Sequence, residues 1–268
     1  MGDHVSFHVG IGFDGLLNAT ALSVLHPRLA VHTAVYLLPL RHPVLVARQL
    51  SSLSQLAPGR LSFGVGVGGE DRREVANCGV DPATRGRRMD ECMQVLRALM
   101  AGESVSFAGE FIQVDEARIL PPPTPAPPLV VGGRSNAAID RAGRLGDGWL
   151  GLWVQLDRWR EAMDRFQEAA ASVGRTVDNP AHGLLVWCGI DDSKEAARQR
   201  VAGPMQMLYQ TPFEKFEKYT PYGTPEDIAG FLQPFVEEGL TSIELIALGG
   251  DEAAAVAGAG EVARLLHM

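Results

Sequence analysis

Two stretches of the sequence carry residue types that can do chemistry. The first contains Gly132, Gly133, Arg134 and Ser135, which follow the short apolar segment 129–131 and precede a helix-length stretch. Glycines let the backbone approach a ligand closely, and free N–H groups and the helix dipole converge where a helix begins. Ser135 can cap that helix. The run therefore predicts a phosphate site, although an ordinary strand-to-helix turn explains the same residues equally well.

The second candidate lies at the start of the sequence, where Asp3 and His4 are adjacent. A histidine ring titrates close to neutral pH, so His4 is suited to hold or move a proton beside a cofactor. His8 follows four residues later, and this pair beside an aspartate raises the alternative of a metal site. No third ligand with matching spacing occurs elsewhere, so we expect no metal. A solvated terminal segment without a function is the remaining interpretation.

Glycines at alternate positions mark the segment 61–69. Gly64, Gly66 and Gly68 leave one face of a predicted strand nearly bare. Such a face is typical of a crowded bend or of a flat ligand that lies against the backbone.

The same segment matches the dinucleotide spacing G-x-G-x-x-G when Gly69 is included. That fingerprint should open a helix at once and be followed about 20 residues later by an acidic residue at the end of the next strand. Here the acidic pair at that distance, Asp90 and Glu91, lies inside a predicted helix. The pattern therefore disfavours an NAD-dependent Rossmann enzyme.

Hydrophobic periodicity divides the chain into alternating strands and helices. Buried strands are expected at residues 29–38, 61–67, 129–131, 149–150, 183–190 and 242–248. Helices are expected at 14–25, 43–57, 81–99, 137–145, 156–173, from 194 onward, 225–238 and 252–266. The segments 70–128 and 204–222 are long and less regular; the first includes a predicted hairpin at 105–114 and a tether with six prolines at 121–128. This alternation predicts a parallel α/β sheet, open or closed.

Composition excludes several classes of protein. The 268 residues are 46% hydrophobic and 21% charged, which is ordinary for a globular protein. A net charge of -8 argues against nucleic-acid binding, and no apolar run approaches the roughly 20 residues of a membrane span. The three cysteines, Cys78, Cys92 and Cys188, have no metal-ligand spacing and are expected to be buried free thiols of a reducing compartment. We therefore expect a cytoplasmic protein without nucleic-acid or membrane partners.

Taken together, the ordered motifs resemble the bacterial luciferase-like monooxygenase family. This family includes flavin-dependent monooxygenases and oxidoreductases that use the 8-hydroxy-5-deazaflavin coenzyme F420. The resemblance spans nearly the whole chain, and it is the order and spacing of the motifs that make it specific. The motifs are Asp3-His4, Thr33-Ala34-Val35, the run 38–43, Gly59-Arg60-Leu61, the glycines of 64–68, Val131-Gly132-Gly133 and Gly146-Asp147-Gly148-Trp149.

The resemblance implies a single-domain (β/α)8 TIM barrel over residues 1–268, with insertions at about 70–128 and 204–222, and a cofactor at the carboxyl ends of the strands. It implies that the cofactor is FMN or F420, that His4 faces its ring, and that Asp3 lies beside it. Ala34 and Val35 match the position of a non-proline cis peptide behind the ring. Further cofactor contacts are implied for Gly64, Gly66, Gly68, Gly132, Gly133, Arg134 and Ser135.

Two departures from the family pattern affect these expectations. Relatives carry a first strand, a first helix and most of a second strand before the Asp-His pair. We therefore expect a barrel that is incomplete at the N-terminus, with six well-formed strands from residue 29 onward and at most a remnant near Asp3. Gly69 stands where some deazaflavin relatives have a glutamate for proton transfer, and Glu70 is only adjacent.

The function implied is a flavin- or F420-dependent oxidoreductase or monooxygenase that acts on a small organic substrate, as a homodimer. The alternative from a different class is a non-catalytic flavin-binding protein or subunit. The sequence does not identify the substrate.

Overall fold

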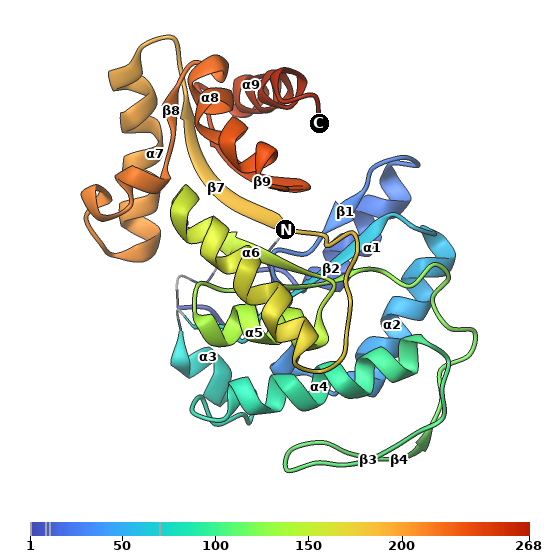
Figure 1. The fold of residues 1–268 in the computed structure, drawn as a ribbon. Coiled ribbons are helices and arrows are strands. Elements are labelled where there is room, and N and C mark those ends of the chain that lie inside the picture. The colour runs from blue at the N-terminus through green and yellow to red at the C-terminus, as the bar shows by residue number, and fades with distance from the viewer. Residues whose placement is uncertain (1, 9, 11, 70) are drawn as a thin grey trace.

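The computed structural model describes residues 2–8, 10, 12–69 and 71–268. Helices and strands alternate along the chain, and the helices lie outside a curled sheet (Figure 1). In chain order the elements are α1 (Gly15–Leu25), β1 (Val31–His32), η1 (Leu38–Leu40), α2 (Pro43–Leu56), β2 (Leu61–Val65), α3 (Arg72–Asn77), α4 (Arg85–Met100), β3 (Val105–Ala108), β4 (Gln113–Ala117), β5 (Leu129–Gly132), α5 (Asn136–Leu145), β6 (Gly148–Leu152), α6 (Leu156–Ala171), β7 (Gly183–Ile190), α7 (Lys194–Tyr209), η2 (Phe213–Lys215), η3 (Glu217–Tyr219), β8 (Tyr222–Gly223), α8 (Pro225–Glu237), β9 (Ser242–Leu248) and α9 (Glu252–Leu265).

The main sheet is parallel throughout and runs β1-β2-β5-β6-β7, with β9 paired along β7 and the short β8 at the end of β7. The longest ladder joins Gly183–Gly189 of β7 to Ser242–Leu248 of β9. The curled parallel sheet and the helices outside it confirm the predicted α/β fold of the TIM-barrel type. The main sheet has seven strands among the described residues, all after residue 29, but β1 and β8 have two residues each, so five are well formed where six were expected. Residues 2–8 contain no strand.

The two ends of this sheet approach each other at one point. His32 of β1 and Glu244 of β9 form an ion pair through Nδ1 and a carboxylate oxygen. Burial opposes ionisation of Glu244, but the hydrogen bond and charge of His32 outweigh it and lower the pKa of the carboxyl. No ladder joins β1 to β9 within the described ranges, so side chains hold these edges together.

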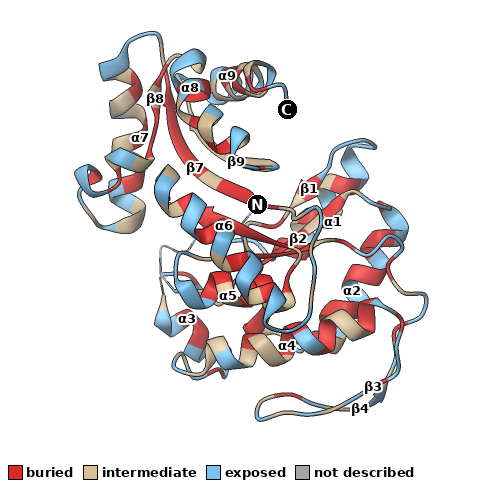
Figure 2. Ribbon diagram, viewed as in Figure 1, coloured by how far each residue is buried: buried red, intermediate tan, exposed pale blue. Residues whose placement is uncertain are grey.

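The core lies between the sheet and the helices, where one face of each helix is buried (Figure 2). Trp149 of β6 packs against Trp159 of α6, and Phe166 and His182 complete an aromatic layer beneath them. The β3–β4 hairpin extends from the body beyond α4 (Figure 1). The carboxylate of Glu91 holds its tip by accepting three backbone N–H groups, from Glu110, Phe111 and Ile112, at 2.8–2.9 Å.

Most predicted elements are confirmed to within a few residues. The predicted strands 183–190 and 242–248 match β7 and β9, and Thr224 caps α8 through the expected capping box. The hairpin at 105–114 is also present, although β4 lies at Gln113–Ala117. No helix in the described ranges is long and apolar enough to cross a membrane.

Three expectations need correction. The strand predicted at 29–38 is wrong beyond His32, because the chain leaves the ladder there and rejoins it only through a single bridge between Tyr36 and Val65. Helix α7 continues through Pro204 to Tyr209, where the sequence suggested irregular structure, although an interior proline removes one hydrogen bond of the helix. Cys92 and Cys188 are buried, but Cys78 is half-exposed at the C-cap of α3.

We predict that His182 makes the fold sensitive to acid. The ring is 3% exposed, and its Nδ1 accepts the Trp149 N–H at 3.2 Å. Burial lowers the pKa of His182 to about 4 from the ordinary 6.5. Between these values the unfolded chain binds a proton that the folded protein does not, so the free energy of unfolding falls by about 3 kcal/mol as the pH is lowered.

Urea unfolding of the wild type and of His182→Asn, followed from about pH 7 to about pH 4, measures this loss. The asparagine variant can still accept the Trp149 N–H but has no titrating ring, so its stability should change less over this window. Equal slopes in the two proteins would contradict the assignment.

Candidate functional site

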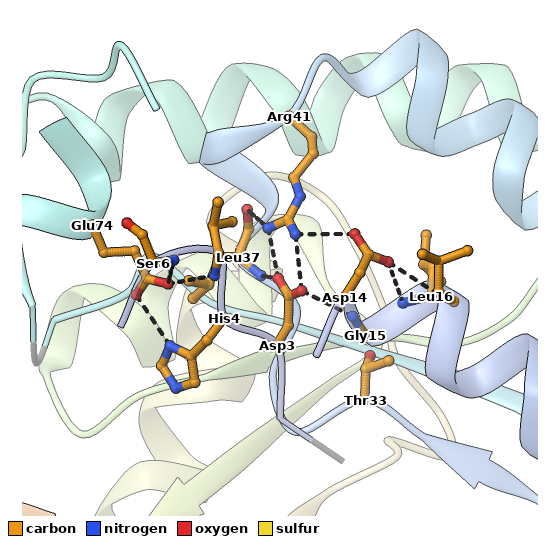
Figure 3. A network of polar contacts seen from close by, with 12 residues as sticks. Asp3, His4, Ser6, Asp14, Gly15, Leu16, Thr33, Leu37, Arg41 and Glu74 are labelled. Atoms are coloured by element: carbon orange, nitrogen blue, oxygen red, sulfur yellow. Dashed lines mark hydrogen bonds and ion pairs between the residues drawn. The ribbon is translucent and has the colours of Figure 1, made fainter. Parts of the chain in front are cut away.

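Asp3 lies at the centre of a buried polar network (Figure 3). The residue is 1% exposed, and its carboxylate accepts the N–H groups of Gly15 at 2.9 Å and Leu37 at 2.8 Å. Arg41 donates through both terminal nitrogens, at 2.6 and 2.9 Å. Both oxygens therefore have partners within the protein. The residue joins the N-terminal segment to α1 and to the turn after β1.

Arg41 carries the positive charge of this network. Its guanidinium also contacts Asp14, the N-cap of α1, at 3.2 Å, and lies 4.5 Å from the ring centroid of Tyr36. Burial disfavours the charged form, but the carboxylate of Asp3 outweighs it and raises the pKa of Arg41. Burial also raises the pKa of the Tyr36 phenol. The arginine is therefore a permanent cation between two carboxylates.

His4 faces away from this network and contacts Glu74 of α3 (Figure 3). Its Nδ1 lies 3.1 Å from Glu74 Oε2, and its ring stacks on Phe7 with centroids 4.1 Å apart. The backbone N–H groups of Val5 and Ser6 donate to Glu74 Oε1 at 2.6 and 3.2 Å. A single carboxylate thus holds residues 4–6.

The metal alternative finds no geometric support in these contacts. His8 lies 3.7 Å from Asp71, whereas His4 contacts Glu74 and Asp3 contacts Arg41. No group of three or more His, Cys, Asp or Glu side chains suited to a metal ion occurs among residues 2–8, 10, 12–69 and 71–268.

The glycines of β2 and β5 face a bulge of the chain at residues 33–35. The peptide bond between Ala34 and Val35 is cis, as the family resemblance implies. A Cβ atom added to Gly64 would lie 1.9 Å from the Thr33 carbonyl oxygen, and one on Gly66 would lie 2.4 Å from a Val35 methyl group. The other Val35 methyl group lies 2.6 Å from the Cβ position of Gly132.

The bare strand face is therefore filled at these positions by the protein's own chain. Only glycine at 64, 66 and 132 lets the bulge pack this closely against both strands. Contacts of these glycines with a cofactor stay a prediction.

The turn between β5 and α5 has the geometry of an anion site. Ser135 is the N-cap of α5 and accepts the Ala138 N–H at 3.2 Å, and Gly133 has a φ of 136°. The indole N–H of Trp149 donates to the Gly133 carbonyl oxygen at 2.7 Å and holds the turn. The first N–H groups of a ten-residue helix then point outward with the positive end of its dipole.

A pocket of ≈ 480 Å³ opens beside this turn. Three arginines line it, and two of them are engaged elsewhere: Arg85 donates to the Gly68 carbonyl oxygen at 3.1 Å, and Arg141 pairs with Asp90. Arg134 forms no ion pair with any residue that the structure describes; its guanidinium lies 4.7 Å from the ring centroid of Trp153. Arg134 is therefore available to an anionic ligand, and Arg85, which donates to the carbonyl oxygens of Gly68 and Pro82, keeps its charge at the same pocket. The remaining lining residues are Gly66, Val67, Gly69, Met89, Val131, Gly132, Gly133, Ser135 and Ala138.

A short chain of contacts links this pocket to Asp3. Leu37 donates to Asp3, and its side chain lies 3.5 Å from the Cβ position of Gly68, whose carbonyl accepts from Arg85 at the pocket. Gly68 itself adopts a φ of 68°. Of the predicted residues, Gly66, Gly132, Gly133, Arg134 and Ser135 line this pocket. Asp3 reaches it only through this chain of contacts, and neither Asp3 nor His4 is among the lining residues. A shared cofactor site at the strand ends therefore stays a prediction. Glu70 lies outside the described residues.

Sequence reasoning missed four residues of this region: Arg41, Glu74, Arg85 and Arg141. Arg41 belongs to one of the motifs that carried the resemblance, but nothing in that motif assigns it a partner. Glu74 follows a run of charged residues, a pattern that predicts exposure, yet it is 2% exposed.

We predict that Asp3→Asn destabilises the fold by about 3–5 kcal/mol, because it leaves the half-buried guanidinium of Arg41, whose side chain is 17% exposed, without its main counterion. The matched control is Asp14→Asn, which contacts the same guanidinium from a side chain that is 33% exposed. Asparagine caps a helix as well as aspartate does, so this control should lose less than about 1 kcal/mol. Urea unfolding at neutral pH measures both; equal losses would contradict a central role for Asp3.

Comparison with known proteins supports the expected family. A sequence model of the luciferase-like monooxygenase family matches residues 1–255. The chain is 39% identical over 155 residues to an uncharacterised protein of Mycobacterium tuberculosis, covering 56% of this chain and 52% of that protein. It is 31% identical over 159 residues to the F420-dependent hydroxymycolic acid dehydrogenase of the same organism, covering 59% and 44%. The chain thus spans about half the length of the first curated relatives that it matches.

Solved structures share the fold at low sequence identity. An F420-dependent secondary alcohol dehydrogenase in complex with an F420-acetone adduct superimposes with a TM-score of 0.87 at 20% identity, over 99% of this chain and 88% of that one. The oxygenating constituent of 3,6-diketocamphane monooxygenase from Pseudomonas putida, in complex with FMN, gives 0.81 at 17% identity, over 99% and 86%. By the match over residues 1–255, this chain belongs to the luciferase-like monooxygenase family.

Proposed function

We propose that this chain is an oxidoreductase that binds a phosphate-bearing deazaflavin or flavin coenzyme, F420 or FMN, and acts on a small organic substrate. The observation that carries the proposal is the anion site at the start of α5, where Arg134 lies beside the Ser135 cap and pairs with none of the carboxylates that the structure describes. A phosphate fits this site, because outward N–H groups, the helix dipole and an arginine favour the same charge. Gly133 lets the turn form, because its φ of 136° suits glycine and a Cβ atom there would lie 2.9 Å from the Ala138 Cβ.

When bound, the coenzyme would supply hydride chemistry at its ring, and the protein would supply binding, orientation and proton transfer. Arg134, Ser135 and the α5 N–H groups would hold the phosphate. His4 is the titratable group proposed to face the substrate, and its ring plane is held by stacking on Phe7. Its exposed side-chain fraction of 30% leaves the imidazole accessible.

Between the two coenzymes, the relatives favour F420. The hydroxymycolic acid dehydrogenase relative and the secondary alcohol dehydrogenase neighbour are both named as F420-dependent. We therefore propose an alcohol as the hydride donor, with His4 as the acceptor of the hydroxyl proton. The FMN-dependent monooxygenase is the second candidate, supported by the diketocamphane monooxygenase neighbour.

An aromatic cluster beside the phosphate turn supports an apolar substrate. Trp153, on which Arg134 stacks, packs against Tyr209 and Phe216 with centroids 4.8 and 4.7 Å apart. Trp187 donates its indole N–H to the Tyr209 hydroxyl at 3.1 Å. The cluster joins β6 and β7 to the 204–222 segment, so this insertion is proposed to shape the substrate pocket.

A cytoplasmic homodimer remains part of the proposal, supported by the free cysteines and by the apolar side chains exposed on α1.

We predict that Arg134→Ala weakens coenzyme binding by about 10- to 100-fold, the loss expected when one charge-assisted hydrogen bond of about 1.5–3 kcal/mol is removed. Fluorescence or absorbance titration with F420 and with FMN measures the dissociation constants. The matched control is Arg144→Ala, which removes an arginine from the other end of α5, where it is 40% exposed and 3.9 Å from Asp90. If the two variants bind alike, the phosphate does not lie at the helix start; if the wild type binds neither coenzyme, the proposed function fails.

We predict that His4→Ala lowers turnover by about 10²- to 10⁴-fold, the usual contribution of a general acid or base, while coenzyme affinity stays within about threefold of the wild type. The assay follows bleaching of oxidised F420 with a panel of primary and secondary alcohols. Unchanged turnover would remove His4 from the reaction. Tight coenzyme binding without turnover of any substrate, with either F420 or FMN plus oxygen, would favour the alternative of a non-catalytic flavin-binding protein.

A further inference from the structure

Glu74 is a buried carboxylate to which the proposed reaction assigns no role. It belongs to the short helix α3, the next helix after β2, and is 2% exposed. Within the described residues, its side-chain hydrogen bonds go to residues 4–6, and Figure 3 shows His4 and Ser6 beside it. The two carboxylate oxygens divide these contacts: Oε1 accepts from the Val5 and Ser6 backbone, and Oε2 faces the His4 ring.

The contact between Oε2 and Nδ1 determines the state of the His4 ring. A carboxylate can only accept, so Nδ1 must carry the proton that lies between them. The neutral ring then has its lone pair on Nε2, on the side of the ring away from Glu74. An unconstrained histidine prefers the opposite tautomer, with the proton on Nε2, so this contact reverses the ordinary preference.

The ring has little freedom to escape this contact. Phe7 stacks on it at 4.1 Å with planes 22° apart, and the His4 backbone N–H donates to Phe13 O at 3.1 Å. A Cβ atom on Gly12 would lie 2.8 Å from the His4 Cβ, so the returning chain passes directly beside it. The side chain is thus held at its base, on its face and at Nδ1.

We propose that Glu74 is a positioning residue that holds His4 as the Nδ1–H tautomer and so presents Nε2 as a proton acceptor. This inference rests on the proposed function, in which His4 accepts the proton of a substrate hydroxyl. In that step the substrate O–H bond breaks, its electron pair stays on oxygen, and a new N–H bond forms at Nε2. The imidazolium produced is paired with the carboxylate of Glu74, which stabilises its charge.

The variant Glu74→Gln separates this role from a purely structural one. The amide oxygen can replace Oε1 and still accept from Val5 and Ser6, whereas the amide NH₂ takes the place of Oε2 and donates to Nδ1. The backbone clamp is thus kept while the His4 tautomer is inverted. Asp71→Asn is the matched control, since Asp71 caps the same helix and lies near a different histidine, His8.

The direct test uses ¹⁵N-labelled protein without coenzyme. Long-range ¹H–¹⁵N spectra in mildly alkaline buffer distinguish the two tautomers, and His4→Gln identifies the His4 signals by their loss. We expect the Nδ1–H tautomer in the wild type and in Asp71→Asn, and the Nε2–H tautomer in Glu74→Gln. The Nε2–H tautomer, or a rapid mixture, in the wild type would overturn the proposal whatever the activity.

The second measurement is turnover of alcohols with F420. Glu74→Gln should lower kcat by about 10- to 100-fold, the loss typical of removing a group that orients a reacting histidine, with little change in KM, coenzyme affinity or Tm. If the loss of kcat is accompanied by a clear drop in Tm, Glu74 has a structural role and the positioning role is overturned. Inverted tautomers in a protein that turns over no alcohol would instead overturn the proposed function while leaving the Glu74–His4 contact intact.

Discussion

The buried pair of Asp3 and Arg41 is the interaction on which the rest of this site depends. Two charges removed from water are stable together only when further hydrogen bonds satisfy the remaining lone pairs, and the N–H groups of Gly15 and Leu37 do so here. The pair therefore joins three segments that are distant in sequence: the N-terminal residues, the start of α1 and the turn after β1. His4 is positioned as a consequence, because it follows Asp3 directly.

A second constraint is steric. The bulge at residues 33–35 occupies the space where side chains of β2 and β5 would lie, so Gly64, Gly66 and Gly132 pack against the chain itself. Two of these glycines, Gly66 and Gly132, also line the pocket of Arg134 and Ser135. The charged network on one side and the anion site on the other are therefore built on one rigid junction, which gives the site a polar end and an end suited to phosphate.

Much of this architecture could be predicted from the sequence, because it depends on interactions between residues that are close together in the chain. Short apolar runs located β7 and β9, and the helical period of apolar residues located most helices. The Thr224 capping box and the Ser135 cap involve residues only three positions apart. The glycines of β2 were visible as a bare face, but both a ligand and a crowded bend explain such a face. The strand predicted at 29–38 failed because the bulge depends on space left by β2 and β5, which no local window contains.

The sequence by itself determined the alternation of strands and helices, the glycine turn and capped helix start of α5, and the ordered motifs that identify the family. Only the tertiary structure decided which partner each charged side chain takes. Asp3 and Arg41 are 38 residues apart, and His4 and Glu74 are 70 apart. Hydrogen-bond and ion-pair energies depend on ångström-scale distance and on burial, and neither can be read from residue type or spacing. For that reason the sequence did not show that Glu74, a glutamate in a charged run, is a buried hydrogen-bond partner of His4.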